Sequence, residues 1–304
     1  MVDETWRPRH DDPLFIMAMD HRDSFGTTLF HVARGSAPTA EQSARMRAAK
    51  ELIYSGLALA RAELRAGRAG VLVDEDYGQA VIAQAGRDGV TLAVPIEASG
   101  HEWFEPRWGA QWLEHVRSVG PAYGKVLVRD NPDLPAADRR AQFERLAAVS
   151  AGLREAGVPL LYELLVPGTP DQLAAVGGDV DRYDRDVRPA LVVRVIADNQ
   201  AAGVEPALWK VEGLDTAEAA AQVAAQARAG GRDADLIVLG RDAPVERLDR
   251  WLRIAAADEA FVGFAIGRSI WEDAVRDWAE GDIGDELARH RIAERYLGFT
   301  RDWS

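Results

Sequence analysis

The chain has 304 residues, 47% of them hydrophobic and 28% charged, with a formal net charge of -13 at pH 7. These values are typical of a globular protein with a full apolar core, and the negative charge argues against nucleic acid as a partner because phosphate groups would be repelled. The absence of cysteine excludes disulfides and thiolate chemistry and is compatible with a cytoplasmic location.

No apolar run reaches membrane-spanning length, and residues 1–12 are polar, so we expect neither a membrane span nor a secretory signal. Apolar runs of strand length alternate with segments of helical periodicity along the rest of the chain. The expected elements, in chain order, are a strand over 13–20, a helix over 39–67, a strand over 70–74, a short connecting helix, a strand over 91–97, a helix within 103–119, a strand over 124–129, a helix over 135–156, a strand over 159–165, a helix over 184–202, a strand over 207–213, a helix over 216–229, a strand over 234–239, a helix over 245–257, a strand over 260–266, and helices from Trp271 and from Asp285.

Near-continuous apolar strands separated by helices predict a parallel sheet that is covered on both faces. Eight such units without a linker favour a closed barrel over an open sheet or two domains. The predicted fold class is therefore α/β, a single (β/α)8 TIM barrel over 1–304, with an N-terminal tail over 1–12 and a C-terminal helix over 284–304.

Local signals refine these expectations. Thr39 and Gln42 have the spacing of a capping box at the start of the first long helix. Lys50 lies off the apolar stripe of that helix, which predicts a solvated side chain. Pro95 is unfavourable in a central strand, so the strand over 91–97 is the least secure. Pro189 is expected to interrupt or to open the helix over 184–202.

The lysines stand out, because only three of the 36 Lys and Arg residues are lysines: Lys50, Lys125 and Lys210. Lys210 lies in the middle of the strand over 207–213. Burial disfavours the charged ammonium, and the uncharged amine is a nucleophile that can form an imine with a carbonyl, which arginine cannot. The alternative interpretation of Lys210 is a buried ion pair.

Polar residues gather at the expected carboxyl ends of the strands, where barrels carry their active sites. They are Asp20, Arg22, Asp74, Glu97, Arg129, Glu163, Lys210, Glu212, Arg241 and Arg268. Alternation along strands places Lys210 and Glu212 on one face, and likewise Lys125 and Arg129. A barrel interior that receives Lys210, Lys125, Glu163 and Asp20 would hold more charge than core packing demands.

The two last strands end in the same pattern, an apolar run followed by Gly240-Arg241 and by Gly267-Arg268. Barrels frequently bind phosphate at these two loops, where glycine lets the backbone approach the anion and arginine binds it with fixed geometry. The alternative is that each glycine only makes a turn and each arginine is solvated.

These residues together resemble the class I, Schiff-base aldolases of the family that includes tagatose-bisphosphate aldolase. The likeness runs through nearly the whole chain, and its segments are 18–22, 72–78, 125–128, 162–163, 209–212 and 267–268. Segments 20–25, 209–213 and 263–269 are similar to the aldolase domain of inositol catabolism, which acts on 6-phospho-5-dehydro-2-deoxy-D-gluconate. The resemblance implies a metal-independent carbon–carbon lyase without a cofactor that releases dihydroxyacetone phosphate and malonate semialdehyde.

Under this interpretation each site residue has an expected role. Lys210 attacks the ketone of the phosphosugar, and Glu163, with a pKa tuned toward neutral pH, is the acid/base group. Lys125 favours uncharged Lys210 by like-charge repulsion and orients the hydroxyl that becomes the aldehyde, while Asp20 positions that hydroxyl or the lysines.

The remaining candidates are substrate-binding residues. Arg268, with Gly240, Arg241 and the Gly267 backbone, would hold the phosphate, whereas Arg22 or Arg129 would meet the far carboxylate. Asp74 is assigned to the same site from its position at a strand end.

Three other functions stay open. A metal-dependent barrel lyase or hydrolase would need clustered histidine and carboxylate ligands, and the six histidines form no paired motif. A barrel that binds a phosphosugar without turning it over could keep the same site. An aldolase for another phosphoketose, of the tagatose-bisphosphate or sulfosugar type, would use the same residues. A homo-oligomer is possible, with Trp103, Trp108 and Trp112 at an interface or between helices and barrel.

Overall fold

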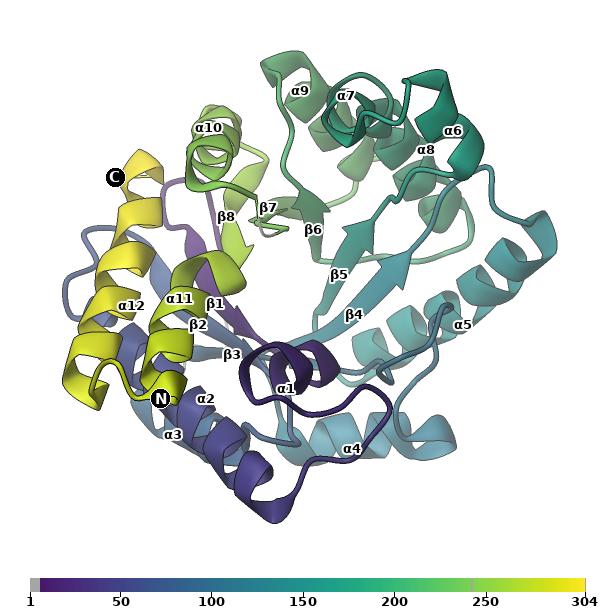
Figure 1. Ribbon diagram of the computed structural model, residues 1–304. Coiled ribbons are helices and arrows are strands. Elements are labelled where there is room, and N and C mark those ends of the chain that lie inside the picture. The colour runs from purple at the N-terminus through teal and green to yellow at the C-terminus, as the bar shows by residue number, and fades with distance from the viewer. Residues whose placement is uncertain (1–5, 242, 304) are drawn as a thin grey trace.

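The computed structural model describes residues 6–241 and 243–303 and shows a closed barrel of eight parallel strands in sequence order. The strands surround the centre of the molecule and the helices lie outside them (Figure 1). The predicted (β/α)8 barrel is therefore confirmed, including the strand that contains Pro95. The strands are β1 (Leu14–Met19), β2 (Arg68–Val73), β3 (Thr91–Pro95), β4 (Tyr123–Arg129), β5 (Leu160–Leu165), β6 (Leu208–Glu212), β7 (Asp235–Leu239) and β8 (Phe261–Ile266).

The helices follow the predicted alternation with local differences. They are α1 (Asp23–Leu29), α2 (Ala40–Arg61), α3 (Gln79–Asp88), the 3-10 turn η1 (Gly109–Gln111), α4 (Trp112–Val119), α5 (Ala136–Glu155), α6 (Pro170–Ala175), α7 (Val180–Asp186), α8 (Arg188–Ala201), α9 (Ala217–Ala227), α10 (Val245–Ala255), α11 (Arg268–Glu280), α12 (Asp285–Thr300) and the 3-10 turn η2 (Arg301–Trp303). Thr39 and Gln42 form the predicted capping box. The segment expected as one helix over 184–202 is divided at Val187, and Pro189 occupies the first turn of α8, where its missing N–H costs nothing.

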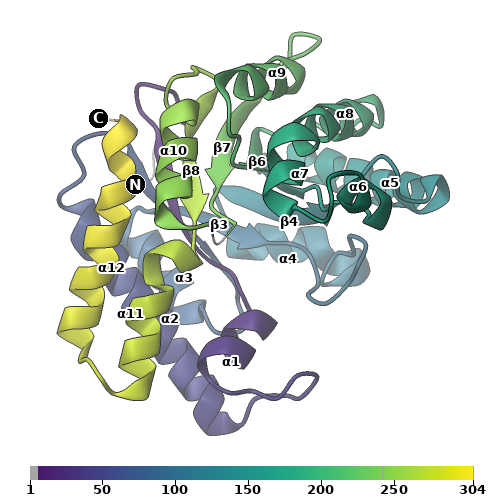
Figure 2. The ribbon, with the colours of Figure 1, turned by 45° about the horizontal axis from the view of Figure 1, so that its top comes forward.

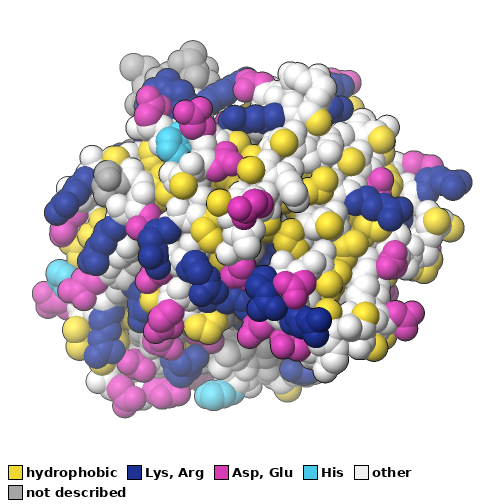
Figure 3. Space-filling model, turned by 90° about the horizontal axis from the view of Figure 1, so that it is seen from above, with side chains coloured by type: hydrophobic (Ala, Val, Ile, Leu, Met, Phe, Trp, Pro, Cys, Tyr) yellow, Lys and Arg dark blue, Asp and Glu magenta, His cyan; other side chains and the backbone are white. Residues whose placement is uncertain are grey.

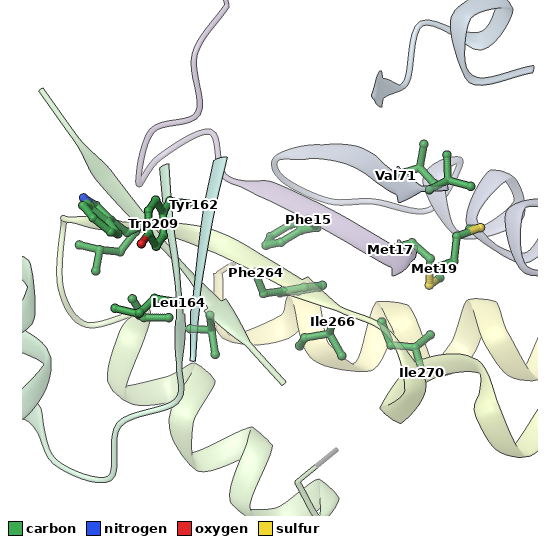
Figure 4. Close-up of a cluster of buried hydrophobic side chains, with 14 of the residues drawn as sticks. Phe15, Met17, Met19, Val71, Tyr162, Leu164, Trp209, Phe264, Ile266 and Ile270 are labelled. Carbon is green, nitrogen blue, oxygen red and sulfur yellow. The ribbon is translucent and has the colours of Figure 1, made fainter. Parts of the chain in front are cut away.

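Side chains alternate between two cores along each strand. One core lies inside the barrel and includes Leu161 of β5 and Leu208 of β6. The other lies between the barrel and its helices, where Tyr162 and Trp209 pack with ring centroids 4.7 Å apart (Figure 4). Because the side-chain period of a strand is two residues, Lys210 shares the inward direction of Leu208. Lys210 therefore points into the barrel.

Closure between β8 and β1 depends on a glycine. Gly263 pairs with Leu14 and has φ of 132°, a backbone conformation that side chains rarely permit. A Cβ atom at this position would lie 2.0 Å from the carbonyl oxygen of Leu14. Only glycine lets the first and last strands approach closely enough to close the sheet.

The chain ends support the closed barrel. In both ribbon views α12 lies beside α2 and α11, so the last long helix packs against the first (Figures 1 and 2). The Tyr296 hydroxyl of α12 donates to the Phe15 carbonyl of β1 at 2.7 Å. At the other end of the chain, Trp6 packs against the interior core and beneath the Arg68 guanidinium, which lies 4.3 Å from its ring centroid. The part of the expected tail that the structure describes is thus packed on the barrel.

Positive and negative side chains are interspersed on the face shown in Figure 3. The three lysines contribute nothing to the surface charge, because each is at most 2% exposed. Among the described helices, none has both the length and the apolar character needed to cross a membrane.

Candidate active site

One glutamate joins two buried lysines at the carboxyl end of the barrel. Glu163 and Lys210 are paired residues on neighbouring strands β5 and β6, and Glu163 Oε1 lies 2.9 Å from Lys210 Nζ. The second oxygen, Oε2, lies 2.9 Å from Nζ of Lys125 on β4. Three consecutive strands therefore place the predicted acid/base group in direct contact with both the predicted nucleophile and the second lysine.

Lys125 has the most counter-charges of the three lysines. Besides Glu163, its Nζ contacts Asp20 Oδ2 at 2.8 Å and Glu97 Oε1 at 2.7 Å. Burial acts to lower the pKa of Lys125, but the three carboxylates outweigh it and raise the pKa well above its ordinary value. Lys125 is therefore an ammonium in the resting protein. Lys210 contacts one carboxylate oxygen, that of Glu163.

The two inner carboxylates are ionised at rest. Burial acts to raise the pKa of Glu163, but the charges of Lys125 and Lys210 outweigh burial and lower it. The same two lysines hold the pKa of Asp20 well below its usual range against the opposing effect of burial. The expectation that Glu163 is tuned toward neutral pH is wrong for the resting site, because two ammonium groups face it rather than one. Glu163 is therefore a carboxylate in the resting site.

A cavity of about 460 Å³ opens above this cluster. It is lined by all the predicted site residues except Asp74: Lys210, Glu163, Lys125, Asp20, Gly240, Arg241, Gly267, Arg268, Arg22 and Arg129. Its volume is that of a small-molecule site, and its polar groups converge from seven of the eight strands and the loops that follow them. The sequence-based grouping is thus reproduced by the fold.

Asp74 and Lys50 form a separate buried pair, which corrects two expectations. Both side chains are 0% exposed, and Lys50 Nζ lies 2.9 Å from Asp74 Oδ2. Asp74 follows the last residue of β2, so strand alternation no longer directs its side chain inward, and Asp74 does not line the cavity to which it was assigned. Lys50, expected in solvent, donates to the carbonyl oxygens of Met19 and His21, the residues on either side of Asp20.

The expected phosphate end lies where β8 meets α11. Gly267 precedes the 13-residue helix α11, which begins at Arg268, so first-turn N–H groups adjoin the cavity as anion sites require. A Cβ atom on Gly267 would lie 2.4 Å from the Ala18 carbonyl oxygen. The neighbouring Arg241 has φ of 49°, and its Nη1 lies 2.7 Å from Asp184 and 2.9 Å from Glu212. Buried carboxylates hold Arg241 in place and offset its charge.

Arg22, Arg129 and His21 line other parts of the cavity. Arg22 Nη2 donates to the Glu97 carbonyl at 3.0 Å, and Arg129 is exposed at the end of β4. The His21 ring lies edge-on to Trp271 with centroids 5.7 Å apart. Burial lowers the pKa of His21 to about 4 despite the opposing charge of Asp20, so His21 is neutral at pH 7.

Two cavity residues were not assigned a role from the sequence. Glu97 is the last residue of the strand expected over 91–97 and His21 follows the strand expected over 13–20, and this position is the signal that could have selected them. Within 6–241 and 243–303, no three His, Cys, Asp or Glu side chains are arranged to hold a metal ion.

Comparison with known proteins gives a family and a fold. The family described as "Uncharacterized protein conserved in bacteria (DUF2090)" matches residues 3–304. The chain belongs to this family. No curated protein matches the DUF2090 chain. It is similar to the crystal structure of Cgl0159 from Corynebacterium glutamicum, with a TM-score of 0.59 and 17% sequence identity over 93% of this chain and 85% of that one. At this identity the likeness concerns the fold.

Proposed function

We propose that this DUF2090 protein is a class I aldolase that cleaves a phosphorylated keto-sugar acid through an imine on Lys210. The observation that carries the proposal is the bridge Lys210–Glu163–Lys125 beneath a ligand-sized cavity. A structural ion pair needs one cation and one anion, whereas here a single base contacts both an amine that can react and a second cation.

Imine formation begins with a proton transfer over a hydrogen-bond distance. The Lys210 ammonium gives a proton to Glu163 Oε1, and the free amine attacks the substrate ketone to form a carbinolamine. Glu163 returns the proton to the hydroxyl of this intermediate, which leaves as water. Glu163 is again a carboxylate, and Lys210 carries the positive charge as an iminium.

Cleavage uses the iminium as an electron sink. The bond between the carbon next to the imine and the hydroxyl-bearing carbon breaks, and its electron pair moves to the Lys210 nitrogen to give an enamine. The hydroxyl proton passes to Glu163 and the hydroxyl oxygen becomes the aldehyde. Lys125, held by three carboxylates, donates to that oxygen. Protonation of the enamine carbon and hydrolysis by water release the second product and restore Lys210.

The charges around the cavity favour a substrate with an anion at each end. Arg268 and the α11 N-terminus adjoin one part of the cavity, as a phosphate requires, while Arg22 and Arg129 adjoin strands β1 and β4. This arrangement supports 6-phospho-5-dehydro-2-deoxy-D-gluconate as substrate, with dihydroxyacetone phosphate and malonate semialdehyde as products.

The test is turnover of a substrate panel with detection of released dihydroxyacetone phosphate. The panel contains the phosphogluconate derivative, tagatose 1,6-bisphosphate and a phosphorylated sulfosugar, each with and without a chelator. We expect preference for the phosphogluconate derivative and no effect of chelation, and no turnover by Lys210→Arg. Preference for another phosphoketose would change the substrate and keep the chemistry. Binding without turnover of any substrate would refute the aldolase.

A further inference from the structure

Glu97 contacts Lys125 directly, as do Asp20 and Glu163, which have predicted roles. Its carboxylate is 11% exposed, with Oε1 2.7 Å from Lys125 Nζ. Oε2 is buried without a hydrogen-bond partner in the described parts of the chain. The backbone is fixed on both sides of Glu97, because Arg107 N–H donates to Ile96 O at 2.8 Å and Ala98 N–H donates to Glu105 O at 2.9 Å. The fold thus keeps this carboxylate on Lys125.

Glu97 adds a third carboxylate to the charge cluster. The cluster holds two ammonium groups, Lys125 and Lys210, and three carboxylates, those of Asp20, Glu97 and Glu163. In an aldolase cycle Glu163 is protonated twice, and at those moments it no longer neutralises Lys125. Asp20 and Glu97 remain. A buried ammonium without ionised partners would lose its proton, so the second and third carboxylates decide whether Lys125 stays charged.

We propose that Glu97 is a positioning residue that, together with Asp20, keeps Lys125 a cation while Glu163 gains and loses protons. Lys125 then acts as a fixed charge and hydrogen-bond donor toward the hydroxyl at the bond that breaks, and Glu163 alone carries protons. This inference rests on the proposed aldolase only for its kinetic consequence. The charge state of Lys125 can be measured whether or not the protein turns over a sugar.

The charged and titratable groups around Lys125 come from four other strands or from the residues that follow them. Asp20 and neighbouring His21 follow β1, Glu97 follows β3, Glu163 lies on β5, and Lys210 on β6 approaches through Glu163. Replacing Glu97 by glutamine keeps the shape and a hydrogen-bond acceptor for Lys125 but removes one negative charge. The pKa of Lys125 must then fall, because burial still opposes its charge and fewer carboxylates compensate.

The low lysine content makes a direct measurement practical. Protein labelled with 13C at the lysine ε-carbon gives NMR signals from three lysines only, each assigned by single replacement with arginine. We expect the Lys125 signal to titrate at a lower pH in Glu97→Gln than in the unmodified protein. Glu105→Gln, on the same β3–α4 connection but outside the cavity, is the matched control and should leave the titration unchanged. Equal titration of Lys125 in Glu97→Gln and the unmodified protein would overturn the proposal.

Kinetics on an accepted substrate test the consequence. Glu97→Gln should lower kcat by about tenfold or more at the highest pH at which the protein stays folded and far less at lower pH, where Lys125 keeps its proton, with KM nearly unchanged. Glu97→Asp restores the negative charge and should recover most of the lost kcat. If Glu97→Gln folds poorly, the kcat of Glu97→Asp tests the charge role of Glu97 instead. A pH-independent loss in Glu97→Gln would contradict the charge role. Absence of turnover in every variant would refute the aldolase and leave the NMR result to decide on Glu97.

Discussion

Replacing Lys50 by methionine should destabilise the barrel. Lys50 is 0% exposed, and its ammonium lies 2.9 Å from Asp74 and donates to the carbonyls of Met19 and His21. Methionine fills a similar volume but leaves Asp74 as a buried carboxylate without its cation and removes the donor to both carbonyls. Removing one partner of a buried ion pair costs about 3–5 kcal/mol, so we expect the free energy of unfolding to fall by that amount.

Urea unfolding measured by tryptophan fluorescence provides the assay. Arg47→Met is the matched control, because Arg47 lies on the same helix with an exposed side chain, and its effect should stay within about 0.5 kcal/mol. The double variant Lys50→Met/Asp74→Leu should recover part of the loss, since no unpaired charge remains. A loss below about 1 kcal/mol in Lys50→Met, or no recovery in the double variant, would refute a buried pair at this position.

Three further predictions concern other parts of the molecule. Arg268→Ala should lower kcat/KM for a phosphorylated substrate about 30-fold, equivalent to about 2 kcal/mol for a lost charge-assisted contact, mainly through KM, and an unchanged KM would remove Arg268 from the phosphate end. Gly263→Ala should destabilise the fold by about 3 kcal/mol or more, because its Cβ would lie 2.0 Å from the Leu14 carbonyl oxygen, and normal urea stability would contradict this close approach. His21 has a folded pKa of about 4 against an ordinary 6.5, so the unfolded chain binds more protons between these values and stability should fall by roughly 3 kcal/mol as the pH drops from 6.5 to 4. His21→Asn should remove this dependence in pH-resolved unfolding, and an unaltered slope would show that another group titrates.

The barrel was predictable because its strands are short apolar runs between clear breaks, and the site because polar residues ended those runs. The sequence suggested that Lys210, Glu163 and Lys125 could meet in a barrel interior, and the structure brings both lysines into contact with Glu163. Grouping these three residues required no structural information other than the closure of the sheet.

The errors arose where side chains leave regular elements or where only tertiary packing decides. Lys50 lies next to Ala49 on the buried side of α2. Its burial depends on an ion pair with Asp74, which is far from it in the sequence and follows β2. Asp74 sits one residue beyond β2, where period-two alternation ends. Glu97 was named as a strand-end residue but given no role, because a third carboxylate on Lys125 becomes visible only when β3 and β4 are side by side.

Reductive trapping at Lys210 tests the central claim most directly. Borohydride added during incubation with the phosphogluconate derivative or with dihydroxyacetone phosphate should attach the ligand covalently, and peptide mass spectrometry should locate it on Lys210. The three lysines are buried, so background modification of other side-chain amines is expected to be small. Lys210→Arg should remain unlabelled while Glu105→Gln is labelled normally. A reduced adduct on Lys125, or none on a protein that still cleaves the sugar, would contradict the account.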